Sequence, residues 1–79
     1  MPKLPNIKGK MLLKILQRVG YKIDHIQGSH HILRRFDGKK TTVPVHNNNE
    51  VPKGTLLGIL NDLDISKEEF VSLLKNKKG

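Results

Sequence analysis

The sequence contains no cysteine and no tryptophan, and its 79 residues include only one tyrosine and two phenylalanines. The missing cysteines exclude a disulfide framework and a thiolate metal site. The amino-terminal region has no long apolar run, so we expect neither a signal peptide nor a membrane span. With so few aromatic side chains, a platform on which single-stranded bases stack is not expected either. We therefore expect a cytoplasmic protein that meets its partner through polar and charged groups.

Acidic residues are also scarce: Asp and Glu number 7 against 15 Lys and Arg, which gives a formal net charge of +8. An excess of this size favours a polyanionic partner, either a nucleic acid or an acidic protein. A soluble surface rich in lysine is the simpler alternative. The length allows one domain, residues 1–79, with a modest core, because only 35% of the residues are hydrophobic.

Two segments have the apolar spacing of amphipathic helices. The first is capped by Asn6, ends at Gly20 and carries Leu12, Ile15, Leu16 and Val19 on one face. The second begins near Pro52 and carries Leu56, Ile59, Leu60 and Leu63. A third, shorter helix is indicated by a capping box, in which Ser66 precedes Glu69 by three residues. Phe70, Leu73 and Leu74 form its apolar side, and the lysine-rich end through Gly79 should fray.

Three strands are predicted between the first two helices, at residues 21–27, 30–36 and 39–45. Asp37 and Gly38 are typical of a two-residue hairpin turn. A turn of that length places Ile32, Phe36, Val43 and Val45 on one face of the sheet. Pro44 cannot donate to a neighbouring strand, so the third strand should be an edge strand.

The predicted fold is therefore α+β, with helices packed on one face of a three-stranded antiparallel sheet. We expect most of the core to come from the apolar positions of these elements, namely Leu12, Ile15, Leu16, Val19, Ile32, Val43, Val45, Leu56, Ile59, Leu60, Phe70 and Leu73.

The stretch from Gly28 to Phe36 is the strongest candidate for a site. His30 follows a glycine and a serine, and histidine exchanges protons near neutral pH because its unperturbed pKa is about 6.5. Arg34 and Arg35 follow within one strand and would attract phosphate. A proton-transfer group beside phosphate-binding cations is what cleavage of an RNA backbone requires. On its own, His30 is about as well explained as a histidine packed at the start of a strand.

His46 is a possible accessory acid or base, because the hairpin pairing places it almost opposite Ser29. Capping of the polar loop at residues 46–50 is the simpler interpretation. His31 should point to the opposite face of the sheet from His30, and His25 is interpreted as a surface residue.

Two basic segments are candidates for phosphate contacts. Arg34, Arg35, Lys39 and Lys40 form a basic hairpin, although a solvated charged tip would look the same. Lys53, Gly54 and Thr55 open a helix, where backbone N–H groups and the helix dipole attract anions. An ordinary capped turn is an equally good explanation of that second segment.

Together, four motifs resemble the HicA toxins, which are small RNA-cleaving members of toxin–antitoxin pairs. They are Gly28-Ser29-His30, the hairpin at Asp37-Gly38, Val43-Pro44-Val45-His46 and Pro52-Lys53-Gly54-Thr55-Leu56. Each motif is short, but their order and spacing are specific, and the likeness extends from the first helix to the third.

The resemblance implies a fold like the double-stranded RNA-binding domain and a type II toxin that cleaves mRNA and so stops translation. It implies one catalytic histidine, which matches His30. We expect Ser29 and the two basic segments to contact the RNA. No metal or other cofactor is implied. The expected partners are mRNA and a HicB-like antitoxin that covers the active site. Where the family commonly has a glycine before the last helix, this chain has Asp64 and Ile65, which bears only on the local turn.

Two other classes of function remain open at this point. A non-catalytic RNA-binding module could use the same fold and basic surface. A domain that binds only an acidic protein is a further alternative, and it would show no salt-sensitive affinity for RNA.

Overall fold

The computed structural model describes residues 4–46 and 49–75. Its elements follow the order α1 (Gly9–Arg18), β1 (Lys22–Gln27), β2 (His30–Arg34), β3 (Lys40–Pro44), α2 (Lys53–Asp62) and α3 (Lys67–Lys75). The strands form one antiparallel sheet in the order β1-β2-β3. This arrangement confirms the predicted α+β fold and places β3 at an edge.

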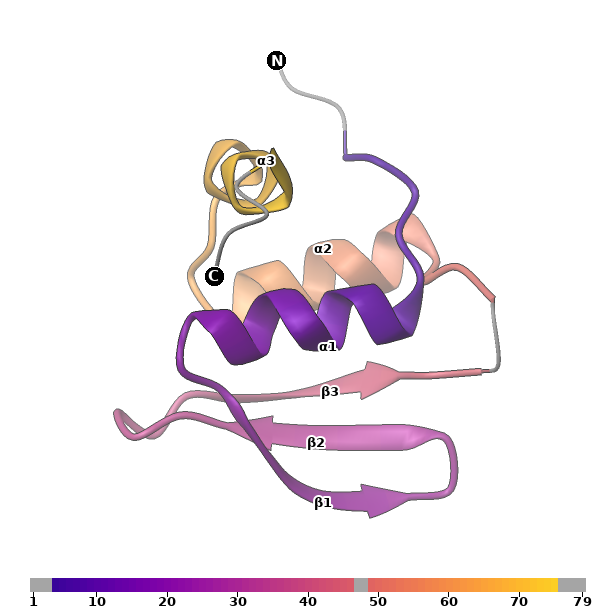
Figure 1. Ribbon diagram of the computed structural model, residues 1–79, viewed down its shortest axis with the longest axis vertical. Helices are drawn as coiled ribbons and strands as arrows, with labels where there is room; N and C mark the ends of the chain where they lie inside the picture. The colour runs from indigo at the N-terminus through magenta and orange to yellow at the C-terminus, as the bar shows by residue number, and fades with distance from the viewer. Residues whose placement is uncertain (1–3, 47–48, 76–79) are drawn as a thin grey trace.

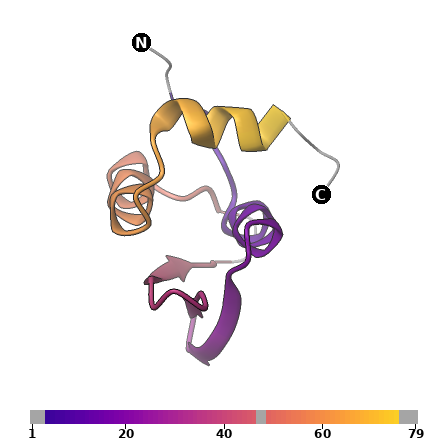
Figure 2. The same ribbon diagram turned by 90° about the vertical axis from the view of Figure 1, so that its left-hand side faces the viewer.

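Within the described residues, helices lie on only one side of the sheet. Figure 1 shows α1 and α2 side by side above the strands, and Figure 2 shows the same arrangement from the end of the sheet. Helix α3 lies across α1 and α2, on their side away from the sheet. The other face of the sheet carries no helix in the described part of the chain, and side chains that point from it are open to solvent.

The core lies between the helices and the inner face of the sheet. Among the predicted core residues, the structure buries Leu12, Ile15, Leu16, Val43, Leu56, Ile59, Leu60 and Phe70. Val19, Val45 and Leu73 are partly buried and pack against this core. Leu63, on the apolar face predicted for the second helix, is buried as well, and five further buried residues were not predicted: Leu4, Ile7, Tyr21, Leu33 and Val51. The helical part of the core therefore agrees with the apolar periodicity, and the additions come from loops and from β2.

The predicted inner face of β2 was wrong by one residue. The hairpin loop has three residues, 36–38, because Arg35 N–H donates to the Lys39 carbonyl over 2.9 Å. Gly38 closes this loop with φ +91°, a conformation that favours glycine. Leu33 consequently pairs with Thr41 and is fully buried. A shift of one residue reverses the faces of a strand, so Ile32 lies on the outer face and Phe36 is 96% exposed.

Helix α1 starts later than predicted. Its N-cap is Lys8, in an extended conformation and without a side-chain capping bond, whereas Asn6 was expected to cap it. The reason is a long-range pairing: Lys8 forms a β-bridge with Glu50, and Val51 N–H donates to the Ile7 carbonyl over 2.8 Å. Extended backbone at residues 7–8 postpones the first helical turn to Gly9.

At the carboxyl-terminal end of the chain, helix α3 begins where the sequence predicts it. Ser66 Oγ accepts from Glu69 N–H over 3.1 Å, and a Glu69 carboxylate oxygen accepts from Ser66 N–H over 3.2 Å. These two bonds confirm the predicted capping box of α3. The predicted fraying at residues 76–79 lies outside the described residues, as does part of the polar loop at residues 47–48.

Candidate active site

His30 is the first residue of β2, and its side chain is exposed. Because Leu33 and His31 point toward the helices, the alternation of the strand places His30 on the outer face. It pairs with Pro44 of β3, so the chain that leaves β3 runs past it. This pairing determines which residues surround the His30 ring.

The two histidines singled out from the sequence lie together at this end of the sheet. Val45 N–H donates to the Ser29 carbonyl over 2.8 Å, which extends the β2–β3 pairing by one step. Ser29 Oγ lies 3.3 Å from His46 Nε2, within hydrogen-bond distance. The His30 and His46 rings are 6.4 Å apart between centroids and meet edge to face at 80°. The structure thus places His46 at the same site as His30.

A cavity of about 390 Å³ opens beside these rings. Its walls include both histidines, Thr42 on β3, Glu50 in the loop before α2 and Thr55 in the first turn of α2. The cavity is therefore bounded by the outer edge of β3 on one side and by the beginning of a helix on the other. Imidazole and hydroxyl groups converge on one space large enough for a phosphate and part of its sugar.

In the first turn of α2, the second predicted phosphate site reaches this cavity through Pro52 and Thr55, and Lys53 and Gly54 are not among its lining residues. Lys53, Gly54 and Thr55 are all exposed there, and Pro52, the N-cap residue, makes no side-chain capping bond. Backbone N–H groups in the first turn of a helix and the positive end of its dipole favour an anion. No sequence pattern relates this segment to His30, and the fold brings Thr55 of the segment to the same cavity as His30.

The basic hairpin lies at the opposite end of β2 from His30. Arg34 is the last residue of that strand, and its guanidinium is 3.9 Å from Asp24. Lys40 begins β3 and is exposed. Both side chains are open to solvent. They lie on the sheet that carries His30, several residues away from it along the strands.

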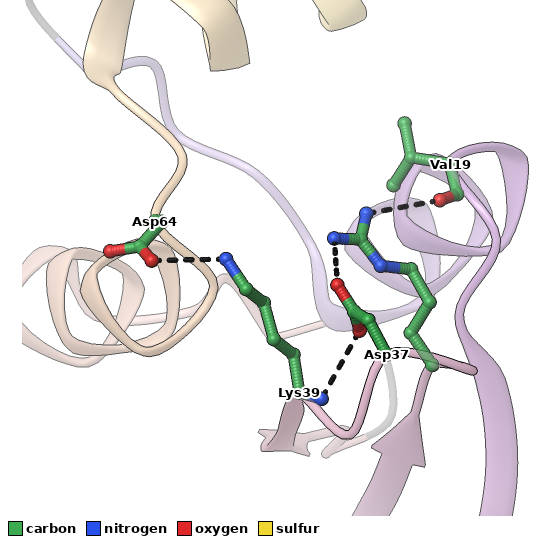
Figure 3. A network of polar contacts seen from close by, with 5 residues as sticks. Val19, Asp37, Lys39 and Asp64 are labelled. Carbon is green, nitrogen blue, oxygen red and sulfur yellow. Dashed lines mark hydrogen bonds and ion pairs between the residues drawn. The ribbon is translucent and has the colours of Figure 1, made fainter.

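The side chains of Arg35 and Lys39 are instead paired with carboxylates of the same domain. Arg35 donates to Asp37 over 2.6 Å and to the Val19 carbonyl over 3.5 Å (Figure 3). Its guanidinium also lies 4.9 Å from the centre of the Tyr21 ring. Lys39 Nζ donates to Asp64 over 2.9 Å, as the same view shows. These contacts fasten the hairpin to α1 and to the turn after α2.

The same contacts set the titration of the hairpin. The hydrogen bond from Arg35 is the main reason that the pKa of Asp37 falls to about 2. Asp37 in turn raises the pKa of Arg35, and the hydrogen bond to Asp64 raises the pKa of Lys39. All three groups therefore keep their charges throughout the neutral range.

We expect Asp37→Asn to destabilise the protein near neutral pH and to have little effect in strong acid. The pKa of Asp37 is lower in the folded state than its ordinary value of 3.8, so its stabilising contribution is complete above about pH 4. That contribution disappears as the pH falls toward 2. Asparagine can still accept the bond from Lys39 N–H, so mainly the charge is removed. Melting curves from pH 2 to 7 should show Tm values that converge at low pH; a constant difference would contradict the assignment.

The remaining histidines lie elsewhere. His31 is partly buried on the inner face, with an Nδ1 atom that is enclosed by the protein. His25 is on β1, where its Nδ1 lies 3.1 Å from Asp24. Neither ring lines the cavity beside His30.

No group of three or more His, Cys, Asp or Glu side chains within residues 4–46 and 49–75 could hold a metal ion. In the same residues, no helix combines the length and the apolar character that crossing a membrane requires.

Comparison with known proteins adds one finding. The family model described as HicA toxin of bacterial toxin-antitoxin matches residues 9–65, which is more than half of the chain. The match begins at the first residue of α1, includes every strand and α2, and covers both histidines of the cavity. No curated protein matches the chain.

Proposed function

This chain belongs to the HicA toxin family, and on that premise we propose that it is a metal-independent endoribonuclease that cleaves mRNA and thereby inhibits translation. Membership of the family makes it the toxin of a toxin–antitoxin system, which implies a cognate antitoxin. The nuclease activity and the role of each residue are our proposal.

The observation that carries the proposal is the position of His30. Its imidazole is exposed at the cavity that also contains His46 and the first turn of α2. A phosphodiester in this cavity would place its negative charge near the N–H groups of α2 and a ribose 2′-hydroxyl within reach of an imidazole. Attack of that hydroxyl on the adjacent phosphorus breaks the bond to the 5′-oxygen and leaves a 2′,3′-cyclic phosphate. His30 serves as base or acid in this transfer.

RNA affinity would come mainly from contacts to the backbone. We assign Lys53, Gly54 and Thr55 to the scissile phosphate, and Arg34 and Lys40 to phosphates further along the strand. Arg35 and Lys39, also predicted as RNA contacts, contribute positive charge to that surface while their side chains are held by Asp37 and Asp64.

The proposed protein partner is a HicB-like antitoxin that covers the cavity. With a net charge of +8 on the toxin, an acidic partner surface is favoured on electrostatic grounds. We propose that both proteins act in the cytoplasm, where mRNA is the substrate.

The direct test of the function is incubation of the purified chain with a defined RNA. We expect cleavage within the strand and, on induction in cells, growth arrest that the antitoxin relieves. An RNA-binding module without catalytic activity would retard the RNA in a gel and leave it intact.

We expect Lys40→Gln to weaken RNA binding and to reduce the slope of log affinity against log salt concentration by about 1. Lys40 is exposed at the start of β3, so its loss removes one phosphate contact without opening the core. Lys14→Gln is the matched control, because Lys14 is an exposed lysine on α1 with the same charge. Fluorescence anisotropy at four salt concentrations measures both slopes. Equal slopes for the two variants would remove Lys40 from the RNA contacts.

A further inference from the structure

We propose that His30 and His46 act as a complementary acid–base pair and that Ser29 positions the His46 ring. The inference rests on the proposed nuclease function and assigns the second half of its chemistry. Cleavage by a 2′-hydroxyl needs one group that removes the proton of the nucleophile and another that gives a proton to the departing 5′-oxygen. These oxygens lie on opposite sides of the phosphorus, so one ring cannot serve both at once.

The geometry of the two rings matches this requirement. A nitrogen that exchanges a proton must lie about 3 Å from its oxygen, so rings on opposite sides of one phosphate must be several ångströms apart. The centroids of His30 and His46 are separated by 6.4 Å. Both rings line the same cavity, and His30 comes from β2 whereas His46 comes from the segment that follows β3. A phosphate between them would contact both.

Ser29 supplies a reason for the orientation of His46. A serine hydroxyl can donate to an unprotonated ring nitrogen and accept from a protonated one. The bond of 3.3 Å between Ser29 Oγ and His46 Nε2 can therefore persist in both states of the ring and leaves Nδ1 for the substrate. The backbone hydrogen bond from Val45 N–H to the Ser29 carbonyl fixes the spacing between Ser29 and His46, the residue that follows Val45. Ser29 is thus a positioning residue for His46 in addition to its expected contact with RNA.

The described part of the chain places few charged side chains around the His30 and His46 rings. Of the residues that the structure describes, Glu50 is the other titratable one that lines the cavity, and it comes from the segment before α2. The first turn of α2 adds Thr55 and backbone N–H groups, and Lys53 is exposed on the same turn outside the lining of the cavity.

The test compares the His30→Gln and His46→Gln variants on two substrates. The first substrate is a defined RNA, on which each variant should be slower than the unaltered protein by roughly 10²–10⁴-fold. The second is a nucleoside 3′-(p-nitrophenyl phosphate), whose leaving group departs without a proton. The variant that lacks the acid should regain nearly the full rate on this ester, whereas the variant that lacks the base should remain slow. The pH–rate profile on RNA should be bell-shaped and should lose one limb in each variant.

Controls separate chemistry from folding. His25→Gln removes an exposed histidine of β1 and should leave both rates unchanged, and the melting temperature of His46→Gln should stay near that of the unaltered protein. Ser29→Ala should lower the rate on RNA by roughly 10-fold, the usual effect of one lost hydrogen bond, and Ser29→Thr should restore it.

Wild-type activity in His46→Gln would overturn the inference. So would equal impairment of both variants on both substrates, since no leaving-group effect would then distinguish an acid from a base. A chain that cleaves RNA but loses activity only on substitution of His30 is a nuclease with one catalytic histidine. Failure of the unaltered chain to cleave RNA would instead contradict the proposed function itself.

Discussion

Replacement of His30 by alanine should lower RNA cleavage by roughly 10²–10⁴-fold, the usual contribution of a positioned general acid or base. The fold should survive, because His30 is exposed at the start of β2 and its backbone pairing with Pro44 needs no side chain. RNA affinity should change little, since the phosphate contacts proposed for Lys40 and for the first turn of α2 remain.

The measurement is the single-turnover rate on a defined RNA, with binding and melting temperature recorded for the same preparation. His31→Ala is an informative comparison because it changes the neighbouring residue on the opposite face of the sheet, away from the cavity. His31→Ala should lower the melting temperature, whereas the cleavage rate of the folded variant should change much less. A fully active His30→Ala protein would exclude His30 as the catalytic group.

The second large effect concerns stability. Leu33→Ala should lower the free energy of unfolding by about 2–5 kcal/mol, because Leu33 is completely buried between the sheet and the helices. That loss is a large fraction of the total stability of about 5–15 kcal/mol typical of a small domain. Much of the variant population should therefore be unfolded at moderate urea concentrations.

Ile32→Ala is the matched control, one residue earlier in the same strand and on the outer face. It should cost less than about 1.5 kcal/mol, as for partly exposed sites. Urea denaturation followed by circular dichroism gives both values. A larger cost for Ile32 than for Leu33 would mean that the inner face of β2 is the one with even residue numbers, contrary to the structure.

The inner face of β2 also shows where the sequence stops being sufficient. Asp37 and Gly38 fit a two-residue turn, but they also fit the end of the three-residue loop that the chain adopts. The choice depends on the bond between Arg35 and Lys39 and on the clamp that Arg35 makes with Asp37 and Val19. One residue of difference decides whether Leu33 or Ile32 is buried, and no local pattern distinguishes the two loops.

Helices were easier to predict because their signals are local. The apolar spacing within α1 and α2 and the capping box of Ser66 and Glu69 depend on residues within two turns of one another. The start of α1 was mispredicted for the opposite reason: the extended pairing of Lys8 with Glu50 is made across 42 positions of the sequence. Likewise, the ion pair between Lys39 and Asp64 could not be inferred from spacing.

The candidate site was predicted from the sequence only in part. The approach of His46 to Ser29 was predicted from hairpin pairing, and it tolerated the shift of one residue because Ser29 faces Val45, the neighbour of His46. The arrival of the first turn of α2 at the same cavity was not predicted, since it depends on the packing of a helix against β3. The residue types were therefore evident from the sequence, whereas their convergence required the fold.

The most direct measurement is the identity of the RNA ends formed by the purified chain in the presence of a metal chelator. A defined RNA is cut in single turnover, and the mass of the 5′-side product is determined. We predict an unchanged rate and a 2′,3′-cyclic phosphate or its hydrolysed form, because the nucleophile is the adjacent 2′-hydroxyl and the proton carriers are imidazoles. A 3′-hydroxyl end, or cleavage abolished by the chelator, would contradict this mechanism.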